Sequence, residues 1–278
     1  MDYKKIDAHQ HFWHYDADKH VWMNEKMGIL KTDYLPKDLA PLLEKCDLSG
    51  CVAVQASQTE AENTFLLQLA NDNSFIKGIV GWVDLCDADV EKRLEYYQQF
   101  PTIKGFRHVL HDELKRDYML RPDFMAGVSL LEKYNYTYDI LIFTDQMGYT
   151  IDFVKAFLEQ KFVIDHIAKP QIKAQTLGNW EADIKAIAAF SNVSCKISGL
   201  VTEADWHNWK QQDFKKYLDI VVEAFGIDRI MYGSDWPVCQ LAATYEAQFD
   251  LVRTYFEAFS EDEKNKFFGQ NATKFYGL

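Results

Sequence analysis

Two histidines near the N-terminus are the first residues whose type and spacing could do chemistry. His9 and His11 lie two positions apart in the short stretch from Lys5 to His11. In a strand, residues i and i+2 share one face at a Cβ separation of roughly 7 Å. We therefore expect both imidazoles, together with Asp7, to point to the same side. Their ring nitrogens could converge on one metal ion or one substrate oxygen, although such a pair also occurs as two ordinary histidines.

A carboxylate near the other end of the chain adds to this pair. Asp235 lies in the run Gly-Ser-Asp-Trp-Pro at residues 233–237, directly after the apolar stretch 229–232. This stretch predicts a last strand that ends just before Asp235. If the first and last strands are neighbours in a closed barrel, Asp235 joins His9 and His11 as a triad.

Other polar side chains fall at the ends of predicted strands. They are Arg107, His108, His166, Lys196 and Ser198. Polar groups of this kind are costly to bury without partners, so we expect them to converge on one site. Two alternatives stay open at this point: His166, next to Asp165, could be a satisfied core histidine, and Lys196 could pair with a carboxylate rather than contact a substrate.

The elements that must position these residues follow a regular rhythm. Eight short apolar strands are predicted, at residues 5–11, 50–56, 77–83, 103–108, 138–143, 162–167, 193–198 and 229–232. Helical patterns separate them, beginning at Pro36, near Thr59, after Asp87, near Pro122, and at residues 151–158, 180–190, 214–225, 245–259 and 261–268. This alternation predicts an α/β protein with one (β/α)8 TIM barrel as a single domain over residues 1–278. Active sites of such barrels lie at the C-terminal ends of the strands.

An irregular, aromatic-rich segment at residues 12–34 follows the first strand. Loops of this length are usually functional. Its tryptophans Trp13 and Trp22 are expected first as packing residues, and they are also well placed to stack on a sugar ring as substrate-binding residues.

Composition excludes several classes of partner. The chain has 278 residues, a formal net charge of −12 and an acidic balance with pI near 5.1, which argues against nucleic acid and anionic membranes. No apolar run approaches the roughly 20 residues of a membrane span. The N-terminus lacks the apolar core of a signal peptide. The five cysteines are scattered and odd in number, as expected for reduced thiols in the cytoplasm.

Five motifs taken in chain order resemble the amidohydrolase superfamily. They are Asp-x-His-x-His at residues 7–11, Lys-Gly-Phe-Arg-His at 104–108, Asp-His-x-x-Lys-Pro at 165–170, Lys-x-Ser-Gly-Leu at 196–200 and Gly-Ser-Asp-Trp-Pro at 233–237. Within it they are similar to amidohydrolase family 2, in the lactonase branch of L-fucono- and L-rhamnono-lactonases and 2-pyrone-4,6-dicarboxylate lactonase. The resemblance covers nearly the whole chain and implies a barrel of the metal-dependent-hydrolase type.

The resemblance also implies roles for individual residues. Asp235 would deprotonate an attacking water and return the proton to the leaving oxygen, a step worth about 10²–10⁴-fold in rate. His9, His11 and His166 would surround the substrate carbonyl, directly or through a metal, and Arg107 would hold a substrate oxygen as a planar donor.

This chain departs from the binuclear members of the superfamily. They bridge two metals with a carboxylated lysine or a glutamate on strand four and use histidines on strands five and six. Here the fourth strand offers Arg107 and His108, and the fifth has no histidine. A second metal therefore has too few ligands. One divalent, zinc-like ion held by His9, His11 and Asp235 and a metal-free site remain the two alternatives.

The number of arginines bears on the substrate. A lactone with several carboxylates would require a cluster of arginines, whereas this chain has only six. Arg93, Arg229 and Arg253 fall on predicted helices or at the N-terminal end of a strand, which leaves Arg107, with Arg116 and Arg121 as further candidates. We therefore expect a small-molecule substrate with many hydroxyls, such as the lactone of a deoxy-sugar acid.

The alternatives to sugar-lactone hydrolysis are hydrolysis of a carboxylated lactone, decarboxylation by another family 2 activity, and a barrel that only binds its ligand. A homo-oligomer is left open.

Overall fold

The computed structural model describes residues 4–278, and its eight strands form one parallel sheet in the order β1 to β8. The strands are β1 (Ile6–Gln10), β2 (Gly50–Val54), β3 (Ile76–Gly81), β4 (Ile103–His108), β5 (Thr137–Ile140), β6 (Phe162–Ile164), β7 (Val193–Ile197) and β8 (Ile230–Tyr232). The sheet closes just beyond β1 and β8, where His11 N donates to the Trp236 carbonyl at 2.7 Å and Asp235 N to the His9 carbonyl at 2.8 Å. The predicted (β/α)8 barrel is confirmed.

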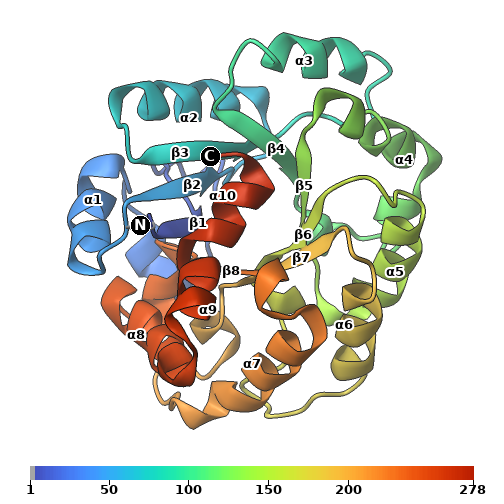
Figure 1. Cartoon of the computed structure of the whole chain (residues 1–278). Coiled ribbons are helices and arrows are strands. Elements are labelled where there is room, and N and C mark those ends of the chain that lie inside the picture. The colour runs from blue at the N-terminus through green and yellow to red at the C-terminus, as the bar shows by residue number, and fades with distance from the viewer. Residues whose placement is uncertain (1–3) are drawn as a thin grey trace.

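The helices form a ring outside the strands (Figure 1). They are α1 (Pro36–Lys45), α2 (Glu60–Asp72), α3 (Val90–Tyr97), α4 (Pro122–Val128), α5 (Met147–Lys155), α6 (Trp180–Ala188), α7 (Gln212–Phe225), α8 (Tyr245–Tyr255), α9 (Glu261–Asn265) and α10 (Asn271–Tyr276). Within residues 4–278, no helix has the length and apolarity that crossing a membrane requires.

Some element boundaries differ from the prediction. The fifth strand ends at Ile140 rather than Phe143, and α5 begins at Met147, four residues earlier than expected. Asp87 does not start α3, because its carboxylate accepts a hydrogen bond from Asp89 N, which closes a turn before the helix begins at Val90.

The first strand contains an irregularity that moves Asp7 off the face it was expected to share with His9 and His11. Asp7 pairs with Cys51, and Gln10 pairs with Ala53, so β1 has one more residue than β2 between these pairs. A bulge of this kind reverses the alternation of side chains. The Asp7 carboxylate accepts hydrogen bonds from Tyr245 of α8 at 3.0 Å and from Ser234 N at 2.9 Å. The prediction for Asp7 was wrong, because period-2 alternation does not hold across a bulge.

The C-terminal helix α10 closes the N-terminal end of the barrel. Its residues Ala272 and Tyr276 pack in one cluster with side chains from β1, β2, β3, β6 and β8. Lys104, at the start of β4, donates to the Gly277 carbonyl at 2.7 Å. Figure 1 shows α10 lying inside the ring of helices, across the strands. The opposite, C-terminal end of the barrel is therefore the end at which a site can open.

Candidate active site

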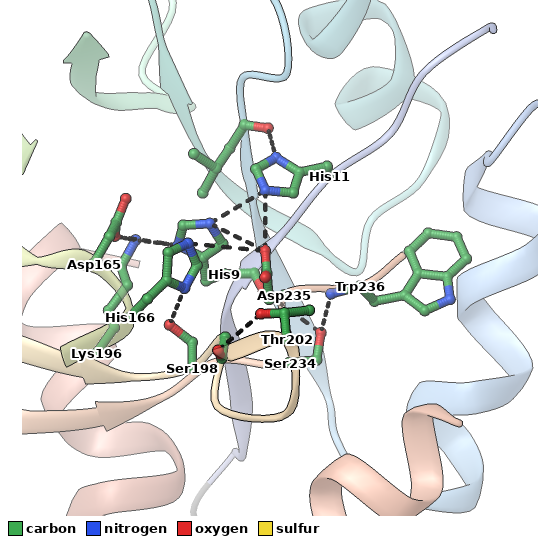
Figure 2. Close-up of polar contacts among 12 residues, drawn as sticks. His9, His11, Asp165, His166, Lys196, Ser198, Thr202, Ser234, Asp235 and Trp236 are labelled. Carbon is green, nitrogen blue, oxygen red and sulfur yellow. Dashed lines mark hydrogen bonds and ion pairs between the residues drawn. The ribbon is translucent and has the colours of Figure 1, made fainter. Parts of the chain in front are cut away.

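His9, His11 and Asp235 come together at the C-terminal end of the barrel. His9 Nε2 and His11 Nε2 are 3.2 Å apart, and Asp235 Oδ1 lies 3.4 Å from His11 Nε2 and 3.9 Å from His9 Nε2. All three side chains are buried, and with His166 they point toward one another (Figure 2). The hydrogen bond from Asp235 N to the His9 carbonyl, which closes the barrel, also places the carboxylate beside the histidines.

The hydrogen bonds of the two histidines fit a bound cation. His11 Nδ1 lies 2.8 Å from the Val54 carbonyl, which can only accept, so we assign the proton to Nδ1 and a lone pair to Nε2. His9 Nδ1 lies 3.2 Å from Asp165 Oδ1 and 3.1 Å from Lys196 Nζ. With the proton on Nδ1, directed at the carboxylate, His9 Nε2 has a lone pair, and Arg107 Nη1 lies 3.3 Å from it. Metal-ligating histidines usually donate their second N–H in this way.

The distances support the same conclusion. Two lone pairs 3.2 Å apart repel each other, and a cation bound by both nitrogens would remove that repulsion. Tetrahedral coordination with bonds of about 2.0–2.2 Å separates neighbouring ligand atoms by roughly 3.3–3.6 Å. The two shortest separations in this triad, 3.2 and 3.4 Å, are close to that range, and the third is 3.9 Å. His9, His11 and Asp235 are thus a suitable donor set for one divalent ion.

Asp235 is held in its ionised form. Burial raises the pKa of its carboxyl, but His166, His11 and His9 outweigh that effect, and the pKa lies well below the ordinary value of 3.8. Its backbone is left-handed, with φ of 58°. A non-glycine residue in this conformation is strained, and such strain is concentrated at functional sites.

His166 faces the same carboxylate from β6. Its Nε2 lies 3.9 Å from Asp235 Oδ1, and its Nδ1 lies 2.9 Å from Ser198 Oγ. Burial lowers the pKa of His166 to about 3, so the ring is neutral at ordinary pH. Gly199 provides the space for this ring, because a Cβ at that position would lie 2.6 Å from His166 Nδ1.

The chain from His166 to Lys169 forms one left-handed turn. The four φ angles are 55°, 49°, 58° and 49°, and left-handed helical backbone costs roughly 1–2 kcal/mol per residue. Hydrogen bonds from Lys169 N to the His166 carbonyl and from Trp180 Nε1 to the Ile167 carbonyl, both 2.8 Å, hold the turn. Neighbouring structure thus fixes a conformation that the chain would not adopt alone.

A buried network of charges lies beside the histidines. Arg107 donates to Asp165 Oδ2 at 3.1 Å and to the Gln55 carbonyl at 2.6 Å. Lys196 Nζ lies 3.1 Å from Asp165 Oδ1 and donates to Asp139. Burial raises the pKa of Asp165, but Lys196, His9 and Arg107 more than reverse this, so its pKa lies well below the ordinary value. This network fixes His9, because Asp165 accepts from its Nδ1.

A second group of His9, Asp165 and His166 also brings three donor atoms together. The guanidinium of Arg107 and the ammonium of Lys196 both contact Asp165. Two cations beside the same carboxylate make a further divalent ion unfavourable there. The expectation that a second metal has too few ligands stays a prediction, and the two cations are a separate, electrostatic argument against such an ion.

The residues predicted to bind substrate are placed differently from one another. Arg107 is buried beside His9, with its Nε unpartnered within residues 4–278. Lys196 has no exposed surface and pairs with the carboxylate of Asp139, which is the alternative to substrate contact that the sequence left open. His108 follows Arg107 in β4 and points to the outer side of the strand. Its ring stacks on Tyr118, and its Nε2 lies 2.7 Å from Glu113 Oε1.

The two tryptophans of the first loop lie in or against the core. Trp13 is 2% exposed, and its Nε1 donates to the Thr32 carbonyl. Trp22 is partly buried, with its ring edge against that of Trp13. Their packing role is what the structure shows, and stacking on a sugar stays a prediction.

Sequence reasoning missed several residues of the site. Asp139 and Tyr276 complete the charge network, since Tyr276 donates to both oxygens of Asp139. An aspartate inside the apolar run 138–143 was the available signal, because buried carboxylates almost always have partners. Tyr276 and Gln55 gave no comparable signal, because tyrosine and glutamine occur in many contexts.

Comparison with known proteins identifies similar sequences and structures. The profile of the family described as Amidohydrolase matches residues 6–278. The chain is 38% identical to an L-fucono-1,5-lactonase of Burkholderia multivorans, over 99% of this chain and 96% of that protein. It is 32% identical to an L-fucono-1,5-lactonase of Burkholderia ambifaria, with the same shares covered. The crystal structure of an amidohydrolase from Burkholderia multivorans with bound zinc superposes with a TM-score of 0.96, at 38% identity and 99% coverage of both chains.

Proposed function

The chain belongs to the amidohydrolase family, and we propose that it hydrolyses the ring ester of a sugar-acid lactone of the L-fucono-1,5-lactone class. The observation that carries the proposal is the convergence of His9, His11 and an ionised Asp235 at the open end of the barrel. Two lactonases similar over almost the whole chain support the choice of substrate.

In the proposed reaction Asp235 acts as general base and then as general acid. Its carboxylate takes a proton from water as the water oxygen adds to the ester carbonyl. The bond between the carbonyl carbon and the ring oxygen then breaks, and Asp235 returns the proton to that oxygen, which becomes a hydroxyl of the open-chain acid. No proton is gained or lost by the enzyme over the cycle.

Other residues position the reactants in this proposal. His166, neutral and held by Ser198, faces the same opening as Asp235 and orients the water or the carbonyl oxygen. Arg107, fixed by Asp165 and Gln55, presents positive charge beside the carbonyl. One divalent ion held by His9, His11 and Asp235 would polarise the carbonyl and lower the pKa of a bound water.

Three further predictions concern the substrate class, the cellular location and the oligomeric state of the protein. A small-molecule substrate agrees with the lactonase relatives. The cytoplasmic location is supported by five cysteines that are all free thiols in the structure. A homo-oligomer also stays a prediction.

The experiment that tests the proposal follows acid release from a panel of lactones with a pH indicator. The panel holds L-fucono-1,5-lactone, other aldonolactones and a carboxylated lactone, and each is assayed before and after treatment of the protein with a chelator. We expect the neutral sugar lactones to react fastest, and we expect chelation to remove one zinc ion per chain, measured by metal analysis. Asp235→Asn should lower kcat/KM by about 10²–10⁴-fold, because the amide cannot take the proton.

Three outcomes would each contradict a part of the proposal. Faster hydrolysis of carboxylated lactones would move the substrate to the carboxylated class. Absence of hydrolysis across the panel, with release of carbon dioxide from a hydroxybenzoate, would replace lactonase by decarboxylase. Full activity of Asp235→Asn would remove this residue from the reaction while leaving the substrate class intact.

A further inference from the structure

The left-handed turn after β6 ends in a lysine close to the candidate active site. The Lys169 side chain is only 14% exposed. Its backbone N–H donates to the His166 carbonyl at 2.8 Å, so the side chain starts from the same turn that carries the His166 ring. The strained turn therefore delivers two functional groups to one region, His166 at its start and Lys169 at its end.

Lys169 has a charged partner on the next connection of the barrel. Its Nζ lies 2.9 Å from Oε1 of Glu203, in the segment that follows β7. The two connections are also joined through the backbone, since Lys173 N donates to the Glu203 carbonyl at 2.9 Å. The ammonium–carboxylate pair is therefore not the sole link between these connections.

An aromatic ring lies beside this pair. Phe143 follows β5 and is 38% exposed, and the Lys169 ammonium lies 5.8 Å from its ring centre. His111, from the connection after β4, stacks on Phe143 with ring centres 4.7 Å apart. An exposed aromatic surface with a charged donor and acceptor next to it suits a ring that has both C–H and hydroxyl groups.

The bonding capacity of the pair is only partly used. An ammonium has three donors and a carboxylate accepts several hydrogen bonds. Within residues 4–278, Lys169 Nζ makes one such bond, to Glu203. Neighbouring hydroxyls on a sugar ring are complementary to such a pair, because one can accept from the ammonium while the other donates to the carboxylate.

We propose that Lys169, Glu203 and Phe143 form the subsite that binds the hydroxyl-bearing ring of the substrate. Lys169 donates to one ring hydroxyl, Glu203 accepts from its neighbour, and the ring packs against Phe143. This inference rests on the proposed lactone hydrolysis and identifies which residues recognise the sugar, separately from the ester chemistry at Asp235.

The test compares Lys169→Met with Lys173→Met. Lys173 is the matched control, because it lies on the same connection and pairs with Asp205 at 3.3 Å but is 68% exposed. For L-fucono-1,5-lactone, Lys169→Met should raise KM about 10- to 100-fold, the effect of losing a charged hydrogen bond, with kcat within about threefold of the parent. Calorimetric binding of L-fucose, which has ring hydroxyls and no ester, should weaken to a similar degree. Lys173→Met should change neither value.

Each outcome separates the subsite from the proposed function. An unchanged KM and unchanged L-fucose binding in Lys169→Met overturn the subsite while lactone hydrolysis stands. A parent that hydrolyses no lactone but binds L-fucose through Lys169 overturns the proposed function and keeps the subsite. A parent that does neither overturns both. If Lys169→Met fails to fold by circular dichroism, Glu203→Gln replaces it, with the same increase in KM expected and an unchanged KM overturning the proposal.

Discussion

Two buried carboxylates near the rim of the barrel have pKa values shifted in opposite directions. Burial raises the pKa of Asp7 to about 6, and the hydrogen bonds donated by Ser234, His9 N and Tyr245, all uncharged groups, lower it only in part. Burial also raises the pKa of Asp235, but the neighbouring histidines reverse the shift. Both carboxylates are buried, so their neighbours decide the direction in which each pKa is shifted. This difference agrees with a structural role for Asp7 and with the base proposed at Asp235.

The residue-scale prediction concerns the pH dependence of stability at Asp7. Its folded pKa of about 6 lies above the ordinary value of 3.8, so the folded state binds the proton more tightly. The stability that this group contributes is present below pH 4 and is lost as pH rises toward and through 6. In Asp7→Asn the amide oxygen can accept from both N–H groups and the amide nitrogen can donate to Tyr245. We expect the parent to lose about 1–3 kcal/mol more unfolding free energy than the variant between pH 4 and pH 7.

Urea denaturation of both proteins at the two pH values measures this difference, and every other carboxylate cancels in the comparison. An equal pH dependence in the parent and in Asp7→Asn would show that Asp7 titrates normally.

At the scale of elements, the connections after β6 and β7 hold each other in place. The left-handed turn after β6 carries the His166 ring against Gly199, which follows β7 with φ of 60°. Ser198, also after β7, lies 2.9 Å from the ring nitrogen on that side. Neither connection has its conformation set by its own sequence alone. The position of His166 therefore depends on both connections together.

The element-scale prediction is that Gly199→Ala displaces His166. The added Cβ would lie 2.6 Å from His166 Nδ1. We expect kcat/KM for a sugar lactone to fall by about tenfold or more, since small displacements at a reacting centre are costly. Gly178→Ala is the control, because Gly178 also has a positive φ, 51°, but nothing within 4 Å of its added Cβ.

Steady-state kinetics and thermal melting separate the two contributions. In both variants the unfolding free energy should fall by roughly 1–2 kcal/mol, because alanine is disfavoured in left-handed backbone. Only Gly199→Ala should lose activity. Equal activity in the two variants would mean that the site tolerates movement of His166.

At the scale of the whole molecule, the two ends of the barrel have different roles. The C-terminal ends of the strands carry the candidate site, while α10 fills the N-terminal end with Ala272 and Tyr276. Tyr276 reaches Asp139 inside the barrel, with bonds of 3.0 and 2.9 Å to its two oxygens. The last residues of the chain therefore complete a charge network that begins with its first strand.

The whole-molecule prediction is that Tyr276→Phe destabilises the fold more than it alters substrate binding. Removing the hydroxyl leaves a buried carboxylate with one partner fewer, which costs about 1–3 kcal/mol. The KM for a lactone should stay within about twofold, because α10 lies at the end of the barrel opposite to the candidate site. The control is Tyr255→Phe, which removes a similar bond of 3.0 Å to Asp219 at the surface and should cost little.

Chemical denaturation and lactone kinetics on the two variants provide the check. A large increase in KM without loss of stability in Tyr276→Phe would place α10 in substrate recognition instead of closure.

The sequence by itself determined the barrel and the residues most central to its site. Eight apolar stretches separated by helical patterns are enough to predict a parallel sheet, because strand and helix periods are local properties of the chain. His9, His11, His166 and Asp235 were found because each lies at or just beyond the end of such a stretch, and a parallel barrel brings those ends together.

The tertiary structure decided what depends on packing between distant segments. The bulge in β1 turned Asp7 away from the histidines, since strand register is set by the partner strand. The side chains that share Asp165 come from separate strands, so their spacing in sequence gave no sign of contact. The left-handed turn at His166 costs backbone energy, and it is held by its own Lys169 N to His166 carbonyl bond together with contacts from Gly199, Ser198 and Trp180. Local patterns therefore predict the elements, and long-range contacts select the conformations that make a site.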